Sequence, residues 1–264
     1  MQSPLEMPEQ ADSQQGWIRR FLTVPELLLI VLAGPLLVQF AFMVTGTDVM
    51  ENSRSVVLFM ALEATLTLVL VVLFLHYRCE NPSTLGWVWK NISPEIGWGI
   101  VCVPILFIST IFVNLFFQAF LPQYISTANP LLDLVEDSGD LALFLMSSLY
   151  VGGLKEEIQR AFVLDRFERY LGPILLWPFL RFMDQSNSQR EESSRRLGMV
   201  VGLISWSFLF ALGHVIQGVD SAAGAGILGL LFGLLYLWRR NLIAPMVAHA
   251  LFDVITLLAV WYSY

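Results

Sequence analysis

Residues 55–77 read SVVLFMALEATLTLVLVVLFLHY, an apolar run that contains one carboxylate, Glu63. An α-helix needs roughly 20 consecutive apolar residues to cross the hydrocarbon core of a bilayer. The run is long enough for that crossing, and it therefore predicts a transmembrane helix.

Six further runs have the same character, so the sequence predicts an all-α fold, a polytopic transmembrane helical bundle of about seven spans. The predicted spans are 21–45, 55–77, 97–120, about 141–163, 198–217, 222–238 and 242–262. Residues 171–183 (LGPILLWPFLRFM) are also apolar, but this segment is short and contains two prolines and an arginine. We expect a short interfacial or re-entrant segment there and no eighth crossing.

The composition excludes several classes of protein. Of 264 residues, 56% are hydrophobic and 14% are charged, and the formal net charge is −7. Soluble domains carry about 25% charged residues, so too few charges are present to cover a water-soluble enzyme. The negative net charge also argues against a nucleic-acid partner.

The distribution of the basic residues predicts the topology. With the N-terminus in the cytoplasm, the outer loops are 46–54, 121–140 and 218–221, and Arg54 is the one basic residue of 15 that they contain. This is the positive-inside pattern of a multi-pass integral membrane protein, which would lie in the plasma membrane of a bacterial source. The expected organisation is a disordered cytoplasmic tail (1–20), N-terminal transmembrane helices (21–130) and a C-terminal transmembrane core (131–264) with a cytoplasmic loop at 184–197.

Three polar motifs interrupt the apolar C-terminal runs: KEEIQR at 155–160, FALGH at 210–214 and HALFD at 249–253. An ionised Asp, Glu or Arg at the centre of a bilayer costs roughly 2.5–3.5 kcal/mol on insertion scales, and such residues mark functional sites by default. Each motif also has a structural explanation when taken singly, namely pairing at the interface or hydrogen bonds between helices.

The joint pattern indicates hydrolysis. Adjacent glutamates (Glu156, Glu157), one histidine (His214) and a second histidine with a carboxylate one turn later (His249, Asp253) lie in separate spans. Attack of water on an amide needs a base for the water and hydrogen-bond donors for the developing oxyanion. These residue types supply both.

The three motifs resemble those of the CAAX protease and bacteriocin-processing (CPBP, also called Abi) family of intramembrane peptidases. The family carries a double Glu followed by Arg, then Phe-x-x-x-His, then His-x-x-x-Asn/Asp. Here these are Glu156-Glu157 with Arg160, Phe210 with His214, and His249 with Asp253. The stretch GLLFGLLYLWRRNLIAPMVAHALFD at 229–253 is similar to bacterial members, and the resemblance covers roughly residues 140–260.

The resemblance implies that Glu156 activates water together with His214, while His249 and Asp253 stabilise the tetrahedral intermediate. Arg160 and Phe210 would support the substrate or the site. This mechanism needs no cofactor and no metal. The alternative is a zinc ion held by Glu156, His214 and His249, because two histidines and a carboxylate leave an open coordination position.

Two positions depart from the family pattern. Arg160 follows Glu157 by three residues, whereas the family's Arg usually follows by four. Asp253 stands where the prenyl endopeptidases generally have Asn, and an ionised Asp cannot donate a hydrogen bond to an oxyanion. Asp253 must therefore be protonated or must orient His249.

The depth of His214 poses a further question, because His214 lies near the outer end of its predicted span, while Glu156 and His249 lie deeper. We expect the turn at 218–224 to be sunk into the protein so that His214 can join them.

The leading hypothesis is an intramembrane endopeptidase facing the cytoplasm, which cuts near the C-terminus of a membrane-bound or lipidated substrate. Its partners would be membrane lipid and a peptide or lipidated protein, and the oligomeric state stays open. The first alternative is a catalytically silent scaffold or bacteriocin-immunity-type protein that binds a peptide. The second is a proton-coupled transporter that uses Glu63, Glu156 and the two histidines, His214 and His249.

Overall fold

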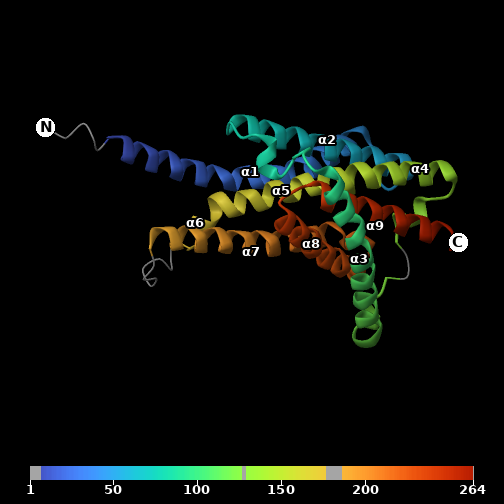
Figure 1. Ribbon diagram of the computed structural model, residues 1–264. Helices are drawn as coiled ribbons and strands as arrows, with labels where there is room; N and C mark the ends of the chain where they lie inside the picture. Colours follow the sequence, from blue (N-terminus) through green and yellow to red (C-terminus); the bar gives the residue numbers. More distant parts are fainter. Residues whose placement is uncertain (1–6, 127–128, 177–185, 264) are drawn as a thin grey trace.

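The computed structural model describes residues 7–126, 129–176 and 186–263, and these residues form helices without any strand (Figure 1). The α-helices are α1 (Met7–Thr45), α2 (Ser53–Tyr77), α3 (Ile92–Phe120), α4 (Ser138–Ser147), α5 (Glu157–Arg166), α6 (Gly172–Leu176), α7 (Asn187–Gly213), α8 (Val219–Arg239) and α9 (Ile243–Trp261). Two π-helices, η4 (Ser148–Glu156) and η5 (Phe167–Leu171), join α4, α5 and α6.

The predicted polytopic helical bundle is confirmed. Within the described ranges, six helices are long and apolar enough to cross a membrane: α1 from Trp17 on, α2, α3, α7 from Ser188 on, α8 and α9. The remaining predicted span, about 141–163, is a helix too, but η4 interrupts it and buried charged residues follow. This interrupted helix carries the double glutamate into the interior of the bundle.

The apolar side chains on the outside of the bundle are those that a lipid environment requires. Val72 on α2 and Phe112 on α3 are among many large apolar residues whose side chains are exposed. A water-soluble protein rarely exposes such continuous apolar surface. These side chains therefore face lipid.

Close packing of α7 against α8 sets the wall behind the site. A Cβ atom at Gly233 of α8 would collide with Leu203 of α7, and one at Gly229 would lie 3.2 Å from Phe210. Small residues let transmembrane helices approach closely. On the other side α9 packs against α3, which crosses the other helices steeply (Figure 1).

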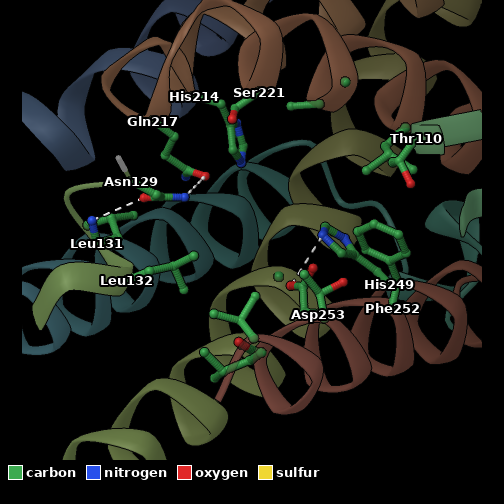
Figure 2. A pocket seen from close by; sticks show the side chains of 18 of the residues that line it. Thr110, Asn129, Leu131, Leu132, His214, Gln217, Ser221, His249, Phe252 and Asp253 are labelled. Atoms are coloured by element: carbon green, nitrogen blue, oxygen red, sulfur yellow. Dashed lines mark hydrogen bonds and ion pairs between the residues drawn. The ribbon is translucent and has the colours of Figure 1, made fainter. Parts of the chain in front are cut away.

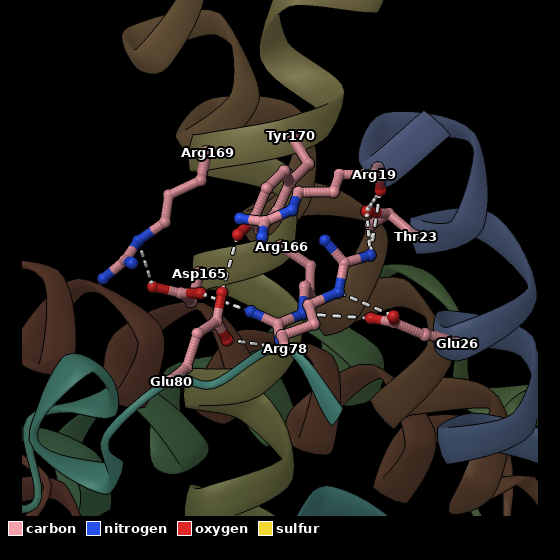
Figure 3. A network of polar contacts seen from close by, with 9 residues as sticks. All are labelled: Arg19, Thr23, Glu26, Arg78, Glu80, Asp165, Arg166, Arg169 and Tyr170. Atoms are coloured by element: carbon pink, nitrogen blue, oxygen red, sulfur yellow. Dashed lines mark hydrogen bonds and ion pairs between the residues drawn. The ribbon is translucent and has the colours of Figure 1, made fainter. Parts of the chain in front are cut away.

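A buried ion network ties α1, α2 and α5 together at one end of the bundle (Figure 3). Arg166 of α5 is fully buried, and its guanidinium contacts Glu26 at 3.2 Å, Asp165 at 2.8 Å and Glu80 at 2.7 Å. Arg78 donates from Nε to Glu26 at 2.6 Å. The network thus joins three segments that lie far apart in the sequence.

Further arginines lie at the same end of the bundle. Arg240 and Arg195 both pair with Glu168, and Arg239 pairs with Glu95 at the start of α3. We refer to this end as the basic end. It is marked by Arg78, Arg166, Arg195, Arg239 and Arg240.

Two expectations from the sequence are wrong, and a third lies partly outside the described residues. The segment 7–20, expected to be disordered, belongs to α1, and residues 1–6 lie outside the described ranges. The expected loop 184–197 is helical from Asn187 on, because Ser186 and Gln189 form a capping box that starts α7. Of the expected re-entrant segment 171–183, residues 171–176 continue the interrupted helix, and the rest is not described.

Candidate active site

The π-helix η4 positions the two adjacent glutamates differently. It ends at Glu156, and α5 begins at Glu157. The side chain of Glu157 is 1% exposed, whereas that of Glu156 is 17% exposed and lines a cavity. π-helical segments are rare and occur frequently at functional sites. The chain therefore presents one glutamate to the cavity and keeps the other in the core.

His249 of α9 lies between the two glutamates. Its Nδ1 is 2.6 Å from Oε1 of Glu157, and its Nε2 is 3.7 Å from Oε2 of Glu156 and 3.6 Å from Oδ2 of Asp253. Because a carboxylate accepts hydrogen bonds, Nδ1 carries the hydrogen that binds Glu157. Phe232 of α8 stacks on the imidazole at 4.4 Å. The Glu157 contact fixes the ring so that Nε2 faces the cavity.

Arg160 binds Glu157 on the side away from the cavity and does not line the cavity. It is fully buried and forms an ion pair with Glu157 one turn earlier in α5. Its guanidinium lies 5.3 Å from the ring of Phe210 and 5.2 Å from that of Phe232. The spacing of three residues is thus compatible with an ion pair, because residues three apart share a helix face.

His214 enters the cavity from the end of α7, where it is the residue after Gly213. Its Nδ1 is 2.8 Å from the carbonyl oxygen of Phe210. A carbonyl only accepts, so Nδ1 carries the hydrogen, and in the neutral ring Nε2 is a free acceptor. The expected sunken turn at 218–224 is not present, because α8 already begins at Val219.

One cavity of about 660 Å³ brings these side chains together (Figure 2). Glu156, Phe210, His214, His249 and Asp253 all contribute to its wall. Much of the remaining wall is apolar, and no lysine or arginine of the described residues lines it. The two other candidate residues, Glu157 and Arg160, lie directly behind the wall.

Part of the chain is similar to a known family of peptidases. Residues 137–255 match the family model described as type II CAAX prenyl endopeptidase Rce1-like. This part of the chain resembles that family. The match begins at the cap of α4 and ends two residues after Asp253, so it includes all three motifs. No curated protein and no solved structure is a significant match to the chain.

Sequence reasoning missed Gly152, which lies beside Asp253 and His249. A Cβ atom at this position would collide with Oδ2 of Asp253 and would lie 3.3 Å from Nε2 of His249. The pair Gly152-Gly153 ahead of the KEE motif was the available signal. Only a residue without a side chain lets η4 approach α9 this closely.

Gly152→Ala is therefore expected to lower peptidase activity at least tenfold, because the added methyl group must displace Asp253 from His249. The rate of peptide cleavage by the purified variant measures this effect. Gly97→Ala is the matched control, since a Cβ there meets nothing within 4 Å. Equal losses in both variants would show that the site tolerates the methyl group and that the loss is a general helix effect.

Glu63 also has a partner that the sequence did not reveal. Lys155, which directly precedes the two adjacent glutamates, lies 2.9 Å from Glu63 of α2, and both side chains are almost fully buried. Thr67 donates a further hydrogen bond to Glu63 at 3.2 Å. The pair anchors η4 to α2, and Glu63 does not line the cavity.

Zinc needs its protein ligands gathered around one point. Among the residues that the structure describes, no three His, Cys, Asp or Glu side chains are placed to hold a metal ion. The set of Glu156, His214 and His249 therefore does not fit zinc in this arrangement.

Proposed function

We propose that the protein is an intramembrane endopeptidase that hydrolyses a peptide bond near the C-terminus of a membrane-bound or lipidated substrate. The observation that carries the proposal is the convergence of Glu156, His214, His249 and Asp253 on one cavity from three different helical segments. Glu156 supplies a base and the histidines supply polar contacts, while the apolar part of the wall suits an apolar peptide or lipid chain.

The geometry supports one sequence of proton transfers. Glu156 takes a proton from a water molecule, whose oxygen forms a bond to the carbonyl carbon of the substrate. The free Nε2 of His214 accepts the second hydrogen of that water and orients it. When the carbon–nitrogen bond breaks, Glu156 returns its proton to the leaving amine.

The developing oxyanion needs hydrogen-bond donors close to the carbonyl oxygen of the substrate. His249 provides Nε2–H when its imidazole is protonated, and the buried contact of Nδ1 with Glu157 keeps the ring in that direction. Asp253 either donates as a protonated acid or holds His249 in place. Glu157 and Arg160 position the histidine and do not contact substrate.

The role of Asp253 can be tested by substitution. Asp253→Asn is expected to retain activity within about tenfold, because an amide donates a hydrogen bond without needing protonation. Asp253→Leu, which is similar in size but has no donor, is expected to lose roughly 10²–10³-fold, the usual effect of removing one oxyanion donor. Cleavage rates of both variants decide this point, and an inactive Asn variant would show that the carboxyl group itself is required.

A panel of peptides tests the proposed activity. The purified protein is incubated in lipid vesicles with farnesylated and unmodified versions of the same peptide, with and without a strong chelator. We expect cleavage that the chelator leaves unchanged, and the ratio between the two peptides reports whether a lipid group is required. Loss of cleavage on chelation, restored by zinc, would contradict the metal-free mechanism.

Asp253 stands where the prenyl endopeptidases generally have Asn, and this difference favours a second candidate function. The protein would then be catalytically inactive and would bind a peptide in the same cavity. This candidate predicts that the peptides of the panel bind without being cut. Binding of equal strength to the wild type and to Glu156→Gln, with no product in either case, would support this candidate over the peptidase.

A further inference from the structure

The cavity reaches the end of the bundle opposite the basic end. Besides the catalytic groups, its wall includes Asn129, Gln217, Asp220 and Ser221. These residues lie in the segment between α3 and α4, in the turn after α7 and in the first turn of α8 (Figure 2). None of the arginines that define the basic end contributes to the wall.

The polar residues at this opposite end hold the two segments together. Ser126 donates its backbone N–H to Asp220 at 3.2 Å, and the side-chain amide of Asn129 donates to Gln217 at 3.5 Å. The cavity thus extends from His249 to a polar region that contains Asn129, Gln217 and Asp220.

The length of α8 places the basic end at one membrane surface. At about 1.5 Å per residue, a helix of 21 residues is about 32 Å long, close to the thickness of the hydrocarbon core. Arg239 and Arg240 at its end therefore lie at one interface, and Asp220 lies at the other. Basic residues concentrate on the cytoplasmic side, and the opposite loop 121–140 has acidic residues without Lys or Arg.

From these observations we infer that substrate reaches the catalytic groups from the extracytoplasmic face of the membrane. The substrate is then a peptide segment exposed on the outer side, close to the lipid. This inference rests on the proposed function for the word substrate, but the direction of access follows from the position of the cavity and the distribution of the arginines and does not depend on catalysis. It reverses the expectation of a cytoplasm-facing site, because the cavity and the arginines lie at opposite ends.

Thiol labelling of intact cells tests the direction of access without any need for catalysis. The native Cys79, exposed just after α2, reports the basic end. In a background of Cys79→Ser and Cys102→Ser, Asp133→Cys reports the opposite surface and Ser221→Cys reports the cavity wall. A membrane-impermeant maleimide is applied to cells before and after permeabilisation.

We expect Asp133→Cys and Ser221→Cys to react in intact cells, and Cys79 to react only after permeabilisation. Reaction of Cys79 alone in intact cells would overturn the inference, because the basic end would then face outwards. Reaction of Asp133→Cys without Ser221→Cys, before and after permeabilisation, would show that the cavity does not open at this face.

A cleavage assay separates this inference from the proposed function. The same peptide is displayed on membrane-anchored reporters that place it either outside or in the cytoplasm. Cutting of the outer reporter alone is expected, and cutting of the cytoplasmic reporter alone would contradict the inferred side. The expected labelling pattern with neither reporter cut, and with the purified protein inactive on every peptide, would contradict the peptidase and leave the direction of access standing.

Discussion

Glu156→Gln is expected to reduce peptide cleavage by roughly 10²–10⁴-fold, the range that a general base contributes. The substitution keeps the size of the side chain and removes its ability to take a proton from water. Glu156 is partly exposed to the cavity, and its ion-pair contact with His249 is 3.7 Å long. The fold should therefore be unaffected, and the melting temperature should stay that of the wild type.

Glu157→Gln is the variant with which Glu156→Gln is compared. Glu157 is fully buried and binds both His249 and Arg160. Its replacement leaves Arg160 without a counter-charge, so we expect lower activity together with a lower melting temperature. If Glu156→Gln keeps more than a tenth of the wild-type rate while Glu157→Gln is stable and inactive, the roles of the two glutamates are reversed.

Arg166→Ala is expected to destabilise the protein by about 3–5 kcal/mol, the usual cost of removing one partner from a buried ion pair. Glu26, Asp165 and Glu80 would then lose their shared cation in the interior. For a protein of this size the corresponding fall in melting temperature is roughly 10 °C. Thermal unfolding in detergent, followed by circular dichroism, measures it.

Arg196→Ala provides the control for this second prediction. Arg196 forms a single exposed pair with Glu192 within α7, and such pairs contribute little. The melting temperature of this variant should change by no more than about 2 °C. An Arg166→Ala variant as stable as Arg196→Ala would mean that the buried network does not hold α1 and α2 against α5.

The sequence predicted the spans well because lipid imposes a simple rule on length and polarity. The run at 55–77 became α2, and the polar motifs marked the side chains around the cavity. The helical start of α7 was missed because its charges suggest a solvated loop. In the structure Arg195 pairs with Glu168 of another segment, and Ser186 caps the helix.

Features that depend on contacts between distant segments could not be predicted. The π-helix η4 has no characteristic amino-acid composition, so it can be recognised only from the backbone structure. Gly152 matters because of Asp253, about 100 positions later in the chain. Likewise, the ion pair of Lys155 with Glu63 joins two spans whose packing the sequence does not specify.

The central claim is that a water molecule activated by Glu156 attacks the peptide bond. Its most direct test is mass spectrometry of the products formed in H₂¹⁸O with hydroxylamine present. Serine hydroxyls of the cavity wall, such as those of Ser148 and Ser221, are the competing nucleophiles. We predict one ¹⁸O atom in the new C-terminal carboxyl group, no hydroxamate, and product formation by Glu156→Gln that is slower by roughly 10²–10⁴-fold. A hydroxamate, or product formation by Glu156→Gln at more than a tenth of the wild-type rate, would contradict the account.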